Sequence, residues 1–302
     1  MQGALDFDGA LTPGPSPTPS LPPGEGRPEN ASVASAPPRA AGPPLRVGIL
    51  GSGSGGNAVV IECGRDRILI DAGFSCKEIG KRMATLGADP KTISALLLTH
   101  EHQDHCKGAD HFAKKYKIPV LATAGTLEGA RLGEERVRAA VLIRSGEPVE
   151  VAGFRIEPFN LPHDAREPVG FVIEDRHGRR CGLVADLGCR TSLAWGRLRD
   201  LDVLMIETNH DLDMLRNGPY PWSLKQRVAG RHGHLSNREA AEGLPELLGD
   251  RLRWVALYHL SRTNNLPALA AAAIGEALDR EGCPAQMVVT HQHYTTPWLE
   301  VP

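Results

Sequence analysis

Hydrophobic residues along this chain gather in short runs that are separated by glycine-rich or charged turns. Three such runs follow one another closely: RVGIL (46–50), NAVVIEC (57–63) and RILID (67–71). Each has the length of a strand and carries several β-branched residues. Because connections this short join neighbouring antiparallel strands, the pattern predicts that the fold begins with an antiparallel sheet.

Strand-like and helical segments alternate further along the chain. A capping-box pattern at Ser75 and Glu78 predicts a helix that ends near Leu86, and the apolar run at 93–99 predicts a buried strand that leads directly to His100. Further strands are predicted at 118–122, 140–143, 148–160, 168–175, 180–185, 202–207, 253–258 and 286–290. Helices are predicted at 105–117, 190–199, 222–230, 236–248 and 266–281. This mixture predicts an α/β (α+β) fold with two β-sheets packed together and helices outside.

The first 44 residues differ in composition from the rest of the chain. They hold 11 of the 24 prolines and 6 of the 33 glycines, and Phe7 is their one aromatic residue. A segment of this composition cannot bury enough apolar surface to offset the entropy that it would lose on ordering. We therefore expect residues 1–44 to be a disordered extension and residues 45–302 to form a single folded domain.

The overall composition narrows the classes of function. Lys and Arg number 34 against 36 Asp and Glu, so the net charge of −2 gives no overall basic excess for non-specific nucleic-acid binding. No run approaches 18 apolar residues, and the first 30 residues lack a signal-peptide pattern. The six cysteines contain no CxxC pair, which indicates reduced thiols. We therefore expect a cytoplasmic protein without a membrane segment.

The strongest chemical signal is an HxHxDH string at the end of a predicted strand, made by His100, His102, Asp104 and His105. Residues i and i+2 of an extended segment point the same way, so His100 and His102 can converge on one metal ion. Asp104 and His105 follow where the chain turns into a helix, and they can hold a second ion. Imidazole and carboxylate suit zinc, manganese or iron, and the lack of paired thiolates argues against a closed structural zinc site. The string therefore predicts an open, catalytic metal site.

This string resembles the metal-binding motif of the metallo-β-lactamase superfamily. Four further residues match that family's other motifs in the family's order: Asp71 in LIDAG, His163 in NLPHDA, Asp186 in LVADLG and His259 in ALYHLS. The resemblance implies a four-layer αββα sandwich with two divalent metal ions. It implies that Asp71 supports the loop that carries the histidines without binding a metal ion itself. The implied ligands are His100, His102 and His163 for one ion, Asp104, His105 and His259 for the other, and Asp186 between them.

Longer segments are similar to a narrower group in that superfamily, the bacterial YycJ/WalJ subfamily. They are GSGSGGN (51–57), HDAREPVGF (163–171), NHDLDMLRNGPYPWSLKQR (209–227), GHLSN (233–237) and HLSRTNN (259–265). Members of this group are regarded as 5′→3′ exonucleases on double-stranded DNA that are linked to mismatch repair. The resemblance therefore implies a DNA-end substrate, repair proteins as partners, and a metal-bound hydroxide that attacks phosphorus.

Residues in the second half of the chain add to a phosphodiesterase interpretation. Glu207 in IETNH and His234 in GHLSN resemble motifs of the tRNA 3′-processing nucleases in the same superfamily. We expect Glu207 to hold His234, which acts as phosphate ligand or general acid, while Asp104 or Asp186 orients the hydroxide. The residues expected to contact substrate are Asn57, His210, Lys225, Arg227, Arg231 and Arg262.

Two alternatives remain open. A small-molecule metallo-hydrolase acting on a thioester, lactone or cyclic phosphodiester would use the same metals without a polymer groove. The third motif at His163 lacks the GHTxG-like pattern usual in thioesterases of the glyoxalase II kind, which counts against that branch. A non-catalytic metal-stabilised binding module is the second alternative, and the complete ligand set argues against it. Whether the Cys106 thiol faces a metal is not decided by the sequence.

Overall fold

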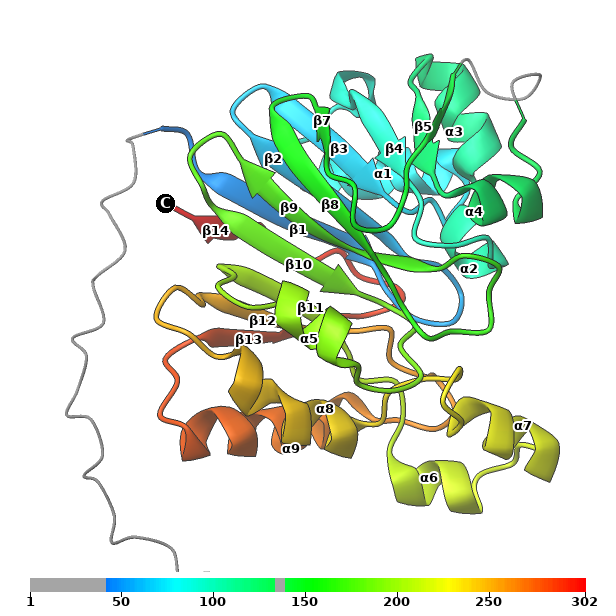
Figure 1. The fold of residues 1–302 in the computed structure, drawn as a ribbon, viewed down its shortest axis with the longest axis vertical. Coiled ribbons are helices and arrows are strands. Elements are labelled where there is room, and N and C mark those ends of the chain that lie inside the picture. Colours follow the sequence, from blue (N-terminus) through cyan, green and yellow to red (C-terminus); the bar gives the residue numbers. More distant parts are fainter. Residues whose placement is uncertain (1–41, 134–138) are drawn as a thin grey trace, which may run out of the picture. The chain divides into compact units, whose positions relative to one another are not determined.

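Two mixed β-sheets form the centre of the fold (Figure 1). The structure is a computed structural model that describes residues 42–133 and 139–302, so residues 1–41 of the expected extension lie outside the described residues. Within these ranges the first sheet consists of β1 (Leu45–Gly51), β2 (Ala58–Cys63), β3 (Asp66–Ile70), β4 (Ala95–Leu97), β5 (Val120–Ala122), β6 (Ala140–Leu142) and β14 (Leu299–Val301). Its order is β14-β1-β2-β3-β4-β5-β6. Strands β1 to β3 pair antiparallel, which confirms the prediction, and β3 to β6 run parallel.

The second sheet repeats this plan. In the same ranges it consists of β7 (Val149–Val151), β8 (Phe154–Asn160), β9 (Val169–Asp175), β10 (Arg180–Val184), β11 (Val203–Glu207), β12 (Trp254–Tyr258) and β13 (Gln286–Val289). Its order is β13-β12-β11-β10-β9-β8-β7. Strands β7 to β10 pair antiparallel, and β10 to β13 run parallel.

Helices cover the outer face of each sheet, which confirms the predicted αββα sandwich (Figure 1). The helices are α1 (Cys76–Thr85), α2 (Gln103–Cys106), α3 (Ala109–Tyr116), α4 (Ala124–Gly129), α5 (Ser192–Arg197), α6 (Leu212–Asn217), α7 (Trp222–Val228), α8 (Asn237–Gly243) and α9 (Pro267–Arg280), with 3₁₀ turns at Pro90–Thr92 and Leu244–Leu247. Helices α1 and α3 lie on the first sheet, and α5, α8 and α9 lie on the second. Among the described residues, no helix combines the length and the apolar character needed to span a bilayer.

Strand side chains alternate between two apolar layers. In β2, Val59 and Ile61 face the layer between the sheets, whereas Ala58 and Val60 face α1 and α3. Because both faces are covered, the whole strand is buried, and all of its residues except Glu62 are apolar. Full burial of one Val or Ile side chain contributes about 1.5–3 kcal/mol, so these layers fix how the sheets pack.

The segment 148–160, predicted as one strand, is a hairpin of β7 and β8. Ala152 and Gly153 form its turn, with φ angles of 48° and 75°. Two consecutive positive φ angles suit a two-residue hairpin because they match the twist of the flanking strands. Alanine seldom adopts this conformation, so the sequence carries only half of the usual turn signal. The prediction of a single strand was wrong for this reason.

The helix predicted at 105–117 is divided into α2 and α3, and Gly108 lies at the break. The Gly108 amide donates to the Ala72 carbonyl at 2.7 Å, and a Cβ there would lie 2.0 Å from the Phe74 carbonyl oxygen. This close approach redirects the chain between the two helices. The short elements α4, α6 and β14 were not predicted either, since segments of three to six residues carry little periodicity.

We predict that Gly73→Ala destabilises the protein. A Cβ at Gly73 would lie 1.7 Å from the Asp104 carbonyl oxygen, so the substitution forces apart two loops that meet at the sheet edge. The expected loss in the free energy of unfolding is about 1–3 kcal/mol by urea denaturation. Gly196→Ala in α5 is the matched control, because its Cβ would meet nothing within 4 Å, and it should stabilise the protein by up to about 1 kcal/mol. Equal midpoints for the two variants would contradict this account.

Candidate active site

The predicted site residues gather at one edge of the sandwich, where strands of both sheets end. Parallel strands bring their carboxyl ends to the same edge, which is where open α/β sheets usually bind ligands. The residues that end or follow these strands are Asp71 (β3), His100 (β4), His163 (β8), Asp186 (β10), Glu207 (β11) and His259 (β12). The sequence therefore supplies a polar residue at the end of nearly every strand that reaches this edge.

Three of these residues adopt a left-handed backbone conformation. The φ angles are 58° for Asp71, 49° for Asp186 and 57° for His259. A non-glycine residue in this region costs on the order of 1–3 kcal/mol and is held there by its surroundings. Each of the three lies within two residues of the end of a strand, so the turn redirects the chain at the place where the side chain must enter the site.

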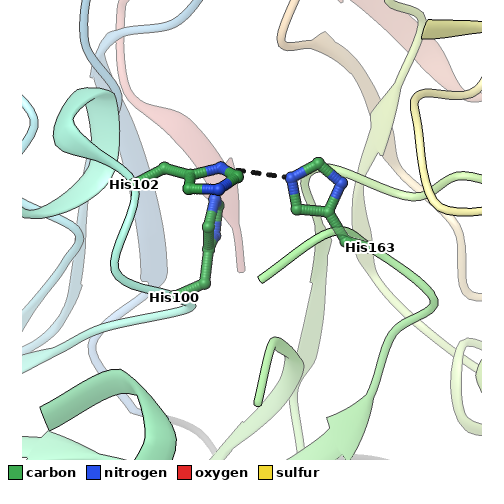
Figure 2. A group of neighbouring side chains, drawn as sticks. All are labelled: His100, His102 and His163. Carbon is green, nitrogen blue, oxygen red and sulfur yellow. Dashed lines mark hydrogen bonds between the residues drawn. The ribbon is translucent and has the colours of Figure 1, made fainter. Parts of the chain in front are cut away.

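The first group of candidate ligands contains His100, His102 and His163 (Figure 2). His100 and His102 come from the loop after β4, and His163 comes from the loop after β8. Nε2 of His163 lies 3.2 Å from Nδ1 of His102, and the rings of His100 and His102 have centroids 4.6 Å apart. One nitrogen from each ring lies within 4.8 Å of the others, so the three could hold one ion.

The second group contains Asp104, His105 and His259. Asp104 and His105 lie on the short helix α2, which begins directly after His102, and His259 follows β12. The Asp104 Oδ2 atom lies 3.2 Å from His259 Nε2 and 3.6 Å from His105 Nε2. The two groups are close to each other, because His100 and His105 also form a group with Asp186 and their ring centroids lie 4.2 Å apart.

The Asp186 carboxylate lies between the two groups. Its Oδ2 atom is 2.9 Å from His105 Nε2 and 3.9 Å from His100 Nε2. Its Oδ1 atom is 3.8 Å from His163 Nε2 and 3.2 Å from His259 Nδ1. One carboxylate thus contacts histidines of both groups.

The outer ring nitrogen of four histidines is held by a neighbouring oxygen. The pairs are His105 Nδ1 with Asp71 Oδ2 at 2.7 Å, His259 Nδ1 with Glu207 Oε1 at 2.9 Å, His163 Nδ1 with the Gly233 carbonyl at 3.0 Å, and His100 Nδ1 with Thr99 Oγ1 at 3.0 Å. This leaves Nε2 of each ring facing the centre. Histidines that bind metals are commonly oriented in this way. Sequence reasoning named Asp71 for this task, but it assigned Glu207 to His234 and gave no such role to Thr99 or to Gly233 of the GHLSN segment.

The buried charges of the cluster influence one another strongly. Burial lowers the pKa of His163, and it lowers the pKa of His100 well below its usual range. Although burial acts in the same direction on His259, the Asp186, Asp104 and Glu207 carboxylates together outweigh it and raise the pKa of His259 to about 10. Asp186 likewise raises the pKa of His105 well above its usual range. In return, His259 and His105 overcome the effect of burial and hold the pKa of Asp186 well below the usual value.

The donor set fits divalent metal ions. Nε2 of His100 is buried and makes no hydrogen bond, although it faces Asp186. An unpaired buried nitrogen is unfavourable unless a ligand or ion occupies the space in front of it. Cys106 takes no part, because its thiol donates to the Glu101 carbonyl at 3.0 Å and burial raises its pKa to about 11. All six cysteines are free, as the sequence predicts.

His234 and Glu207 lie beside the Asp186 carboxylate. His234 Nδ1 is 2.9 Å from Glu207 Oε1 and 3.3 Å from Asp186 Oδ1. The other oxygen of Glu207 accepts from the amides of Leu187 at 2.7 Å and Leu235 at 3.0 Å. Glu207 is fully buried, but its interactions with His234 and His259 together outweigh burial and lower its pKa to about 2. The His234 side chain is 21% exposed, so this pair joins the buried cluster to solvent.

The residues expected to contact substrate fall into two classes. Arg227, Arg231 and Arg262 are exposed, and Lys225 is partly exposed. Asn57 and His210 are 0% and 1% exposed, so the expectation that they contact substrate does not agree with the structure. Asn57 Nδ2 lies 3.0 Å from His105 Nε2, and the His210 carbonyl accepts from the Asn237 amide. Both residues are therefore part of the frame around the site.

Comparisons with known proteins show which family this sequence matches. A family model described as a beta-lactamase superfamily domain matches residues 66–259. The chain is 31% identical over 240 residues to exodeoxyribonuclease YycJ of Bacillus anthracis, and the alignment covers 79% of this chain and 90% of that protein. It is 35% identical over 232 residues to exodeoxyribonuclease WalJ of Streptococcus pneumoniae, and this alignment covers 75% of this chain and 85% of that protein.

The fold is also similar to solved structures. The metallo-β-lactamase fold protein YhfI from Bacillus subtilis superposes with a TM-score of 0.65 at 15% sequence identity. The match covers 85% of this chain and all of YhfI. At this identity the similarity establishes the fold and nothing about the reaction.

We predict that Asp71→Ala strongly destabilises the protein even without metal. Asp71 accepts from the Thr99 amide at 2.9 Å, from the Thr99 hydroxyl and from His105 Nδ1, and all of these donors are buried. Their loss should lower the free energy of unfolding by at least about 2 kcal/mol, measured by urea denaturation in the presence of a chelator. Glu242→Gln, which removes only the exposed pair with Arg238, should change it by less than about 0.5 kcal/mol. A small effect of Asp71→Ala would show that these hydrogen bonds do not hold the loop.

Proposed function

Because the chain belongs to the metallo-β-lactamase superfamily, we propose that it is a dinuclear metal-dependent phosphodiesterase, and specifically a 5′→3′ exonuclease on double-stranded DNA. The observation that carries the proposal is the position of Asp186 between two groups of histidines, with His234 beside it. The names of the two relatives, which align over most of this chain, support DNA as the substrate. A role in DNA repair within the cytoplasm, together with repair proteins, belongs to the same proposal.

The proposed ligands are divided between two sites. One ion would be held by His100, His102 and His163, the other by Asp104, His105 and His259, and Asp186 would contact both. Zinc, manganese and iron all suit this set of nitrogen and oxygen donors. When bound, a pair of such ions supplies Lewis acidity toward phosphate oxygens and lowers the pKa of water toward about 7.

The protein's own groups have distinct tasks in this reaction. Asp104 is 24% exposed at its side chain, so its carboxylate, or that of Asp186, can orient the attacking water. Glu207 holds Nδ1 of His234, which leaves Nε2 as the nitrogen that donates a proton to the departing sugar oxygen. The exposed cations Arg231 and Arg262, with Lys225, are available to the phosphates of the strand.

The first test combines metal removal with end-labelled DNA. Chelator-treated protein should be inactive. Protein reloaded with manganese or zinc should degrade duplex DNA from its 5′ end, which is followed on one duplex labelled at the 5′ end and another labelled at the 3′ end. Asp104→Ala should remove hydrolysis but leave DNA binding intact. If the loaded protein cleaves a chromogenic phosphodiester and leaves duplex DNA untouched at low salt, the small-molecule hydrolase is the better interpretation.

A second test addresses the proton donor. His234→Ala should lower kcat on DNA by about 10²–10⁴-fold, because the sugar oxygen must be protonated as it leaves. The same variant should lose far less activity on a p-nitrophenyl phosphodiester, since p-nitrophenolate leaves without a proton. His293→Ala, an exposed histidine that takes no part in the cluster, serves as the control and should match the wild type on both substrates. Equal losses on the two substrates would contradict a general-acid role for His234.

A further inference from the structure

A small groove between α6 and α7 has no role in the reaction described above. Leu212 and Leu215 of α6 form one wall, and Trp222 and Lys225 of α7 form the other, in a cavity of about 210 Å³. Trp222 is 68% exposed and Leu212 is 36% exposed. The two helices lie next to each other, apart from α8 and α9 (Figure 1). An exposed tryptophan beside apolar side chains is unfavourable in water and marks a binding surface.

The local sequence holds Trp222 in this exposed position. Pro221 precedes it in an extended conformation, and Trp222 occupies the first turn of α7. The buried residue of this helix is Val228, at its other end. The helix is therefore anchored at its C-terminus and presents its N-terminus, with the tryptophan, to solvent.

The anchored end of α7 lies at the rim of the active site. Arg227 forms an ion pair with Asp164, which directly follows the candidate ligand His163. The His234 amide donates to the Val228 carbonyl at 2.9 Å. Both contacts join the C-terminal end of α7 to residues at the reaction centre, so the helix that carries Trp222 is attached to the site.

Two cations, Lys225 and Arg216, line the groove. Lys225 Nζ donates to the Arg216 carbonyl at 2.7 Å, and among the described residues no carboxylate forms an ion pair with it. Arg216 lies 3.6 Å from Asp213, but both side chains are more than 70% exposed, and such a pair provides little compensation. An aromatic face beside cationic side chains is the combination that binds unpaired nucleotides, by base stacking and phosphate contact.

We propose that this groove binds one unpaired base at the end of the DNA substrate, with Trp222 stacked on the base and Lys225 and Arg216 near the flanking phosphates. The inference rests on the proposed nuclease function and adds a residue that selects frayed or overhanging ends. The size of the groove favours this occupant over a protein partner. At about 210 Å³ it is smaller than the roughly 300–1,000 Å³ of typical ligand pockets, so it accepts a single planar group and not a helix.

The test is a binding measurement on chelator-treated protein, which keeps it independent of hydrolysis. The probe is a fluorescein-labelled duplex with a short unpaired overhang, compared with the blunt duplex. Trp222→Ala should weaken binding of the overhang duplex by roughly fivefold to a hundredfold, with a smaller effect on the blunt duplex. Trp222→Phe keeps an aromatic face and should retain most of the binding. Lys225→Gln should reduce the slope of log affinity against log salt by about 1.

Tyr294→Ala is the matched control, because Tyr294 is 70% exposed and lies outside the groove. It should bind both duplexes like the wild type, and urea midpoints should verify that every variant is folded. Unchanged binding in Trp222→Ala, or equal losses in Trp222→Ala and Tyr294→Ala, would overturn the proposal. A Trp222→Ala variant that binds DNA normally but no longer binds a protein partner would also overturn the proposal. Failure of the proposed function would appear separately, as intact DNA in the end-label assay with metal-loaded wild type.

Discussion

The Asp186 carboxylate is buried among histidine rings, and the rest of the site depends on how that charge is compensated. Asp186 is 2% exposed and contacts His105 and His259 directly, with His100 and His163 further out. An ionised carboxylate in the interior is strongly unfavourable unless opposite charge and hydrogen bonds surround it. The compensating rings come from loops of both sheets, so the site exists only when the sheets have packed against each other. Formation of the apolar layer between the sheets and formation of the site are therefore one event.

The same constraint explains the unusual backbone around the cluster. Asp71 and Asp186 occupy equivalent places in the two sheets, each after a buried strand and each at positive φ. The fold tolerates this backbone strain because the flanking strands β3 and β10 are buried in the apolar layers on both sides. The two aspartates then act differently. Asp71 is enclosed by Thr99 and His105 and holds the loop, whereas Asp186 faces the space between the two groups of histidines.

Much of this architecture can be predicted from the sequence because it depends on local patterns. Buried strands covered on both faces are continuous apolar runs, and the polar residue that ends each run marks the edge where the site lies. What the sequence did not reveal depends on contacts between distant segments. The division of 105–117 follows from the approach of Gly108 to Phe74, and the burial of Asn57 follows from its position behind His105. The Ala152-Gly153 turn was missed because alanine rarely adopts positive φ.

The cluster of histidines and carboxylates does not by itself determine which bond is hydrolysed, since activated water can attack a thioester, a lactone or a phosphodiester. The leaving group distinguishes the thioester from the other two. A thiolate, whose conjugate acid has a pKa near 8.5, departs without help, whereas a sugar alkoxide is nearly as basic as hydroxide and needs a proton. An imidazole held at Nδ1 by a buried carboxylate, with its other nitrogen free, is suited to supply that proton. His234 and Glu207 form such a pair beside Asp186. A thioesterase gains nothing from this pair, so its presence favours substrates that release an alkoxide, phosphodiesters among them, over thioesters.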